Sequence, residues 1–376
     1  MWAWSEKNII LYGAGKEAIN IYYNLCRMGK KDKIKYIIDG GDAEYFFEYK
    51  IYHNIDEIAD SKLYNIIVAT AYEAYKNIVS VLAQKGFIEH VDFVWGKLID
   101  KKIVLVHANC HAESVVKFLE SSTEFNRNYI IYPLPLIHLN TEKRIDENLM
   151  KIADVFIHQD IRRGNCISYE LSDEYLLSKL SQECVNICIP NLVGYGTAVH
   201  QWQIAKICTL GPRNTAIVYR DIFLDEAFQR SDKIHLDSML KEMNNYKYDV
   251  ENIKSKFWAD IERLRKREKN WDIKIADYIL EVFPYEPIFN DRDHPSSFLM
   301  NKICKEIAHK IHIFDLDDKE IELEVGIESF IWHMLKDSFE LKWSKKYVGG
   351  QYGTDKLSYE EYIRKYVWGV YGIYLK

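Results

Sequence analysis

The sequence lacks the long apolar segment that a membrane span requires. Its longest apolar stretches, 129–139 and 185–199, are interrupted by Pro, Asn or Gly, and no run reaches roughly 18–20 residues. The first residues, 1–7, also lack the apolar core of a signal peptide. We therefore expect a cytoplasmic protein without a membrane span, in which any membrane contact is made through partners.

Paired cysteines are also absent. The chain has 7 cysteines, an odd and scattered set without a Cys-x-x-Cys pair. This pattern is typical of reduced thiols and speaks against a disulfide framework or a zinc site. We expect no metal centre.

Neither sign of charge dominates the chain, and proline is scarce. A formal net charge of −6 gives no support to nucleic-acid binding or to general attraction to an anionic membrane. Against only 7 prolines there are 27 tyrosines and 9 tryptophans, which favour aromatic packing or stacking surfaces for sugars or bases. The same tyrosines leave homo-oligomer formation open.

The order of apolar segments predicts an α/β fold with more than one domain, because 376 residues are too many for one ordinary core. Strands and helices alternate from 8 to 98, which predicts a small Rossmann-like parallel sheet. A larger α/β domain with a helix-rich C-terminal part follows. We place the two domains at 1–100 and 101–376, with a charged helical insertion at about 231–280 in the second.

The individual elements follow from the apolar periodicity. We expect an apolar strand that runs into a glycine turn over 8–15, and further strands at 33–39, 65–70, 91–95, 103–106, 129–131, 153–158 and 185–189. We expect helices at 16–28, 72–85, 111–119, 298–311 and 327–339. The tail is rich in Tyr and Trp, and we expect it to pack back on a domain.

A glycine turn between the first strand and the first helix is the first candidate ligand site. Gly13 and Gly15 match the GxGxxG/A pattern, in which Ala18 takes the last position. The first glycine permits a tight turn, and the second lets a diphosphate approach the backbone. Asp39 ends the second strand, where a ribose-binding acid stands in such domains. The pattern indicates a Rossmann-like fold more strongly than it indicates a cofactor.

Residues 7–97 resemble the small domains at the front of PglD-type bacterial sugar acetyltransferases. The resemblance rests on the glycine turn, on Asp39 and on the strand 66–70. It implies a bound nucleotide or sugar nucleotide. A purely structural or assembly role is the alternative, because Gly40 stands where related domains carry Asn or Asp.

The turn Asn109-Cys110-His111 is the most informative segment. It falls between a buried strand and a helix, where backbone N–H groups and the helix dipole favour an anion. A thiol there can become a nucleophile, and Asn109 can donate its side-chain amide to a developing oxyanion. The alternative is that Cys110 is a small buried apolar residue.

Two later segments add polar groups. Gln159 ends a buried strand, and Arg162 and Arg163 follow it, as candidates for gripping a phosphate. His294 lies in a Pro-containing loop with acids on its N-terminal side, so it can serve as a general base that Asp291 or Asp293 orients. The alternatives are a solvated basic turn and an ordinary surface loop.

Taken together, these segments resemble the WcbI-type capsular polysaccharide biosynthesis proteins over residues 103–312. Ala108-Asn109-Cys110-His111 stands where that family has Gly-Asn-Cys-Gln. The Ala-Asp and Gln of the strand at 153–159, Pro190 with Gly194-Tyr195, and His294-Pro295 follow in the family's order. Ala108 and His111 depart from the pattern, which leaves substrate choice open.

The resemblance implies a bacterial enzyme that transfers an acyl group, such as acetyl, from an acyl-coenzyme A to a sugar of a surface-polysaccharide precursor. Its catalytic residues would be Cys110, His294, Asn109 and His111, and Gln159, Arg162 and Arg163 would contact coenzyme A. Two alternatives remain. One is an esterase of the SGNH type, and the other is a non-catalytic assembly protein that binds coenzyme A or a sugar nucleotide.

Overall fold

The computed structural model describes residues 7–161, 167–198, 203–206, 219–247, 249–322, 339–342, 351–352, 355–356 and 358–376. The chain divides into two compact units. One takes in the residues up to 112 together with 120–186, and the other takes in 113–119 and 187–376.

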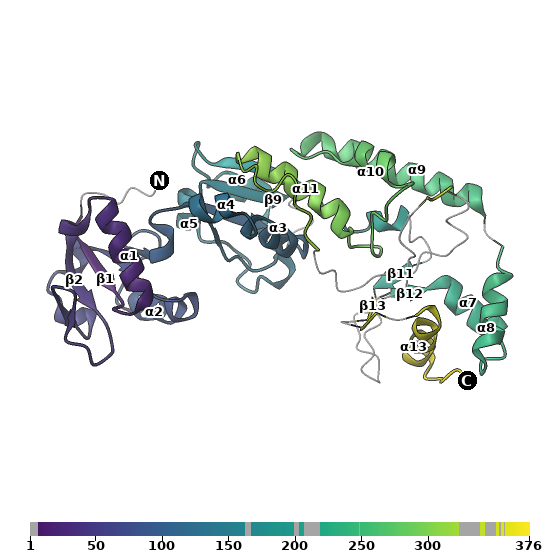
Figure 1. Cartoon of the computed structure of the whole chain (residues 1–376), viewed down its shortest axis with the longest axis horizontal. Helices are drawn as coiled ribbons and strands as arrows, with labels where there is room; N and C mark the ends of the chain where they lie inside the picture. Colours follow the sequence, from purple (N-terminus) through teal and green to yellow (C-terminus); the bar gives the residue numbers. More distant parts are fainter. Residues whose placement is uncertain are drawn as a thin grey trace. The chain divides into compact units, whose positions relative to one another are not determined.

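The N-terminal part of the first unit is a six-stranded sheet (Figure 1), with the order β3-β4-β2-β1-β5-β6. Its strands are β1 (Ile9–Tyr12), β2 (Ile34–Ile38), β3 (Tyr45–Phe46), β4 (Tyr49–Tyr52), β5 (Asn65–Val68) and β6 (Phe93–Trp95). Neighbouring strands pair in parallel, except that β3 and β4 form an antiparallel hairpin that the sequence did not predict. The expected Rossmann-like sheet is confirmed.

Two helices cover opposite faces of this sheet. Because side chains alternate along a strand, Ile9 and Leu11 of β1 point to one face and Ile10 to the other. The first face shares an apolar cluster with α1 (Lys16–Arg27), and the second shares one with α2 (Tyr72–Gln84). Alternation between helix and strand therefore buries both faces, as a parallel sheet requires.

A second sheet has four strands in the order β10-β9-β7-β8. Its strands are β7 (Lys102–His107), β8 (Tyr129–Tyr132), β9 (Val155–Gln159) and β10 (Val185–Ile189), and the helices between them are α3 (His111–Glu120), α4 (Thr123–Asn128), α5 (Glu147–Ile152) and α6 (Asp173–Leu177). Strand β7 pairs in parallel with both β8 and β9. The last residues of β7 and β9, and the turns that follow them, therefore lie at one edge of the sheet.

The two sheets of the first unit share an apolar core. Trp95 of β6 belongs to the same buried cluster as Leu105 of β7 and Phe156 of β9. Tyr75 and Tyr132, one from each part, both donate a hydroxyl hydrogen bond to Glu89, at 2.5 and 3.4 Å. The N-terminal sheet thus supports the strands that lead to the Asn109-Cys110-His111 turn.

The second unit is rich in helices, as expected. It contains α7 (Ile222–Arg230), α8 (Leu236–Asn244), α9 (Val250–Arg267), α10 (Ala276–Val282), α11 (Ser297–Lys310) and α13 (Tyr359–Tyr371), with the short strand pairs β11 (Gln203–Lys206) with β12 (Tyr219–Asp221) and β13 (Gln351–Tyr352) with β14 (Asp355–Lys356). The charged segment 231–280 forms α8, α9 and α10. The helix expected at 327–339 lies outside the described residues, save its last residue.

The aromatic tail packs as expected, with α13 against α7 and α8. Tyr366 of α13 is buried in the cluster that these helices form, and its hydroxyl donates to Asp225 at 2.8 Å. None of the helices in the described part of the chain combines the length and the apolar character that crossing a bilayer would need.

The glycine turn after β1 depends on Gly13 alone. Gly13 has φ +123°, and a Cβ there would lie 2.7 Å from the carbonyl oxygen of Ala69. Gly15 has an extended backbone (φ −83°) and no atom within 4 Å of the corresponding position. The two glycines of the motif therefore face different constraints.

We expect Gly13→Ala to lower the free energy of unfolding by about 2 kcal/mol or more, because the methyl group adds both backbone strain and a clash with the carbonyl of Ala69, which follows β5. Gly15→Ala is the matched control and should change it by less than about 1 kcal/mol. Chemical denaturation of both variants measures the difference. Equal stability of the two would contradict the packing described for this turn.

Candidate functional site

The start of α3 is held by the side chain of the residue before Cys110. The Asn109 Oδ1 atom accepts a hydrogen bond from the backbone N–H of His111 at 3.0 Å, and the Asn109 carbonyl accepts one from Ala112 at 2.9 Å. Together these bonds satisfy two of the first N–H groups of the helix. The Cys110 thiol lies 3.9 Å from the same Oδ1 atom and is partly exposed to solvent.

This arrangement fixes the direction of the Asn109 amide. A backbone N–H can only donate, so the atom that meets it must be the carbonyl oxygen, and the NH2 group points away. In the described part of the chain, neither this NH2 group nor the backbone N–H of Cys110 has a hydrogen-bond partner. Two donors therefore remain at this turn.

The expected oxyanion donors need one correction. The sequence suggested that backbone N–H groups at the start of the helix would favour an anion, and that Asn109 would donate to an oxyanion. The first two of them, at His111 and Ala112, are engaged by Asn109 itself. The two remaining donors are the NH2 group of Asn109 and the amide of Cys110.

Gln159, the last residue of β9, holds the turn from the neighbouring strand. Its Oε1 atom accepts from the backbone N–H of Asn109 at 3.1 Å, and its Nε2 atom lies 3.0 Å from His111 Nδ1. Since an amide nitrogen donates, His111 Nδ1 must accept, which fixes this buried ring as the tautomer with hydrogen on Nε2. These two bonds direct the Gln159 side chain to the turn. Its expected contact with coenzyme A stays a prediction.

Cys110 differs from the deeply buried cysteines. Cys304 of α11 and Cys188 of β10 are buried, and burial raises the pKa of the Cys304 thiol far above its usual range. Burial also raises the pKa of the Cys184 thiol to about 11. Thiols of this kind are inert because the thiolate is the reactive form. The partly exposed Cys110, at the start of a helix, has the more reactive setting.

A pair of buried histidines lies below the turn, at the ends of β7 and β9. His107 and His158 are partners in the parallel register. His107 Nε2 lies 3.3 Å from the carbonyl oxygen of Leu171, and burial lowers the pKa of this ring to about 4. His158 Nδ1 lies 3.1 Å from Asp173, and its ring stacks on Phe156. His107 is therefore neutral at physiological pH and packs in the core. Sequence alone gave no role to His158.

In the second unit, His294 is oriented by Asp291. His294 Nδ1 lies 2.8 Å from Oδ2 of the fully buried Asp291. Asp291 also accepts from the backbone N–H groups of Asp293 and His294, at 2.7 and 2.8 Å. Because Asp291 binds Nδ1, Nε2 is the basic nitrogen of the His294 ring. The His294 side chain is 25% exposed. Of the two candidate orienting acids, only Asp291 contacts the ring.

Asp293 instead joins this loop to the segment around Tyr195. It accepts from the backbone N–H of Gly194 at 3.0 Å, and Gly194 has φ +81°. A Cβ at Gly196 would lie 2.0 Å from the carbonyl oxygen of Asp291. The Pro190-to-Tyr195 segment and the His294 loop are thus packed directly on each other, within the same unit.

The glycine turn of the first sheet is held by Asp39. Its two carboxylate oxygens accept from the backbone N–H groups of Ala14 and Gly41, both at 2.8 Å. Gly13, Gly15 and Asp39 therefore do come together, but the amide of Ala14, at the centre of the turn, is already occupied. Arg162 and Arg163 lie outside the described residues. Within the described ranges no cluster of His, Cys, Asp and Glu is suited to a metal ion.

The segment that carries this turn matches a known protein family. The model of the WcbI polysaccharide biosynthesis enzyme family matches residues 103–316. The chain belongs to this family. No curated protein sequence matches the chain.

A solved structure of WcbI shares the fold. It is described as a novel polysaccharide biosynthesis enzyme, in the native form without a disulfide bond between coenzyme A and one of its cysteines. It has a TM-score of 0.57 and 18% identity, and the match covers 71% of this chain and 89% of that one. The Ala that replaces the family's Gly at position 108 is accommodated, because Ala108 is absent from the described residues with positive φ.

We expect iodoacetamide to label Cys110 in the native protein at pH 8, whereas Cys188 and Cys304 should react only after unfolding, because only Cys110 of the three is exposed. Peptide mass spectrometry before and after addition of guanidinium chloride measures the order of labelling. Protection of Cys110 in the native state would show that its sulfur is sealed from solvent.

Proposed function

We propose that the protein transfers an acyl group from an acyl-coenzyme A to a hydroxyl or amine of a polysaccharide precursor in the cytoplasm. The observation that carries the proposal is the turn at Cys110. It offers a partly exposed thiol at the start of α3, and the NH2 group of Asn109 and the amide of Cys110 are donors in the same turn. This is the arrangement that acyl transfer through a cysteine needs.

In the first step, the Cys110 thiolate attacks the carbonyl carbon of the acyl thioester. The carbonyl oxygen becomes an oxyanion, which the NH2 group of Asn109 and the amide of Cys110 stabilise. The carbon–sulfur bond to coenzyme A then breaks, coenzyme A leaves as its thiolate, and the acyl group stays on Cys110.

In the second step, the acceptor attacks the acyl carbon. His294 removes the proton of the sugar hydroxyl or amine through Nε2, and Asp291 stabilises the imidazolium that forms. The bond to Cys110 breaks, and the thiolate is regenerated. The roles of Gln159 and His111 are to hold Asn109 and Cys110 in place rather than to contact the reacting atoms.

Two further observations support coenzyme A as the donor. The family is one of polysaccharide biosynthesis enzymes, and the solved WcbI structure is described with reference to coenzyme A and a cysteine. Cys110 stands at the turn on which the family resemblance rests, and it is partly exposed, whereas Cys188 and Cys304 are buried.

We expect Cys110→Ala to reduce acyl transfer by about 10³-fold or more, because no nucleophile replaces the thiol. Coenzyme A binding, measured by calorimetry, should stay within about threefold of wild type. Cys184→Ala is the matched control and should keep full activity. Near-full turnover by Cys110→Ala would remove the covalent step, and release of free acid without acceptor modification would indicate an esterase.

We expect His294→Gln and Asp291→Asn each to lower the rate constant by about 10²- to 10⁴-fold, since the first removes the base and the second its orienting partner. Asp293→Asn is the control, because Asp293 binds Gly194 and not the ring. Single-turnover kinetics with preformed acyl-enzyme isolates the second step. Unchanged deacylation in His294→Gln would exclude this residue as the base.

A further inference from the structure

Two arginines of α9 stack on aromatic rings in the second unit. The Arg263 guanidinium lies 4.6 Å from the centre of the Tyr195 ring. Arg267, one helical turn later, lies 5.8 Å from the same ring and 5.2 Å from that of Trp271. Residues four apart lie on one face of a helix, so the two guanidinium groups are neighbours over one aromatic surface.

The positive charge of this cluster is only partly balanced. Arg263 pairs with Asp260 at 2.8 Å. Arg267 has no carboxylate within ion-pair distance anywhere in the described part of the chain, and its contacts are the two rings. Two positive charges four residues apart, such as those of Arg263 and Arg267, repel each other and destabilise a helix slightly. Attraction between the guanidinium groups and the aromatic rings offsets this repulsion only in part. An anion bound between the two side chains would remove the repulsion.

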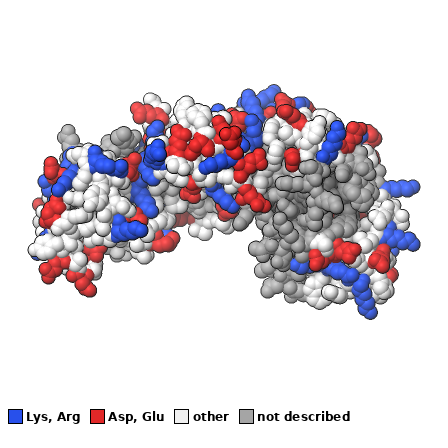
Figure 2. Space-filling view, viewed as in Figure 1, with Lys and Arg blue, Asp and Glu red and all other residues white. Residues whose placement is uncertain are grey.

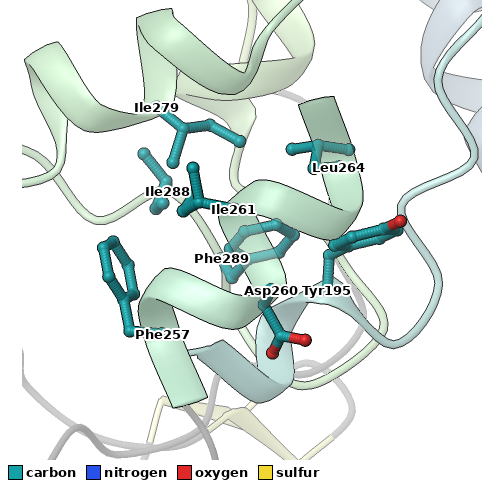
Figure 3. A pocket seen from close by; sticks show the side chains of 8 residues that line it. All are labelled: Tyr195, Phe257, Asp260, Ile261, Leu264, Ile279, Ile288 and Phe289. Atoms are coloured by element: carbon teal, nitrogen blue, oxygen red, sulfur yellow. The ribbon is translucent and has the colours of Figure 1, made fainter. Parts of the chain in front are cut away.

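Two buried donors in the same cluster also lack partners. The Tyr195 hydroxyl and Trp271 Nε1 are buried and accept or donate no hydrogen bond within the described ranges. An unsatisfied buried donor costs about 1–3 kcal/mol, so native structures seldom retain it without a reason. Tyr195 lines a small apolar pocket, and Figure 3 shows its hydroxyl pointing away from Ile279 and Ile288.

This cluster is joined directly to the loop that carries His294. Tyr195 stands between Gly194, which donates to Asp293, and Gly196, which abuts the carbonyl of Asp291. A group held by the α9 arginines would therefore be fixed relative to the proposed base by one short segment of the same unit. On the face of the molecule that Figure 2 shows, Lys and Arg side chains are interspersed with Asp and Glu side chains.

We infer that Arg263 and Arg267, with Tyr195 and Trp271, form a subsite for a phosphate or diphosphate group of a substrate. Guanidinium groups bind phosphate oxygens with paired, charge-assisted hydrogen bonds, and the rings hold the guanidinium planes in place. The inference rests on the proposed function, in which the acyl donor carries such groups. Coenzyme A and a sugar nucleotide share this chemistry, and the experiment separates them.

Calorimetric titration of the full-length protein tests the subsite with four probes: coenzyme A, pantetheine, UDP-glucose and sodium pyrophosphate. We expect Arg263→Gln and Arg267→Gln to weaken binding of coenzyme A by about tenfold each, since each loses one charge-assisted contact. Binding of pantetheine, which has the thiol arm without phosphate, should not change.

The matched control is Arg265→Gln. Arg265 lies in the same helical turn, but it is paired with Glu262 and Asp277 at 2.7 and 2.6 Å and does not reach the rings. It should bind coenzyme A within about twofold of wild type. Thermal unfolding of all three variants confirms that each is folded at the temperature of the titration.

The outcomes separate the subsite from the reaction. If Arg263→Gln and Arg267→Gln bind coenzyme A as tightly as Arg265→Gln does, or if no phosphate-bearing probe binds the wild type, the inference is wrong. The Cys110→Ala experiment still decides the transfer step. If UDP-glucose rather than coenzyme A binds, with the same dependence on Arg263 and Arg267, the inference holds and the proposed acyl donor is wrong.

Discussion

The parallel pairing of β7 with β9 is the constraint on which the turn at Cys110 depends. In this register His107 lies opposite His158, so the residues that follow them in the two strands also lie together. Gln159 can therefore reach both Asn109 and His111 from the neighbouring strand. Without this pairing, the turn would rely on Asn109 alone, and the start of α3 would lose the group that fixes the His111 ring.

The turn before α3 and the loop that carries His294 satisfy their backbone N–H groups in the same way. A short turn carries backbone N–H groups that no helix or strand satisfies, and one side chain accepts from them. Asn109 does so before α3, and Asp291 does so before His294. In each case the accepting group also sets the direction of a reactive group. Asn109 leaves its own NH2 group as a donor at the turn, and Asp291 leaves Nε2 of His294 as the basic nitrogen.

Sequence predicted the elements that have strong apolar runs, and it missed those that do not. The strands of both parallel sheets and helices α1, α2, α3 and α11 were expected within a few residues. The β3–β4 hairpin was not, because its strands are short and Phe47 takes the left-handed conformation that glycine or asparagine normally marks. The sequence indicated that Gln159 ends a buried strand, but it did not indicate where the side chain points. That direction depends on a hydrogen bond with Asn109, which follows a different strand.

A glycine motif alone does not establish a nucleotide site. A ribose-binding acid must keep its carboxylate oxygens for ligand hydroxyls, and the turn must keep its amides for phosphate. Asp39 uses one oxygen on Ala14 and the other on Gly41, and Gly13 is explained by its close approach to Ala69. The N-terminal sheet also shares its core with β7 and β9. These contacts favour the structural alternative for this domain, as a support for the strands that end at Cys110.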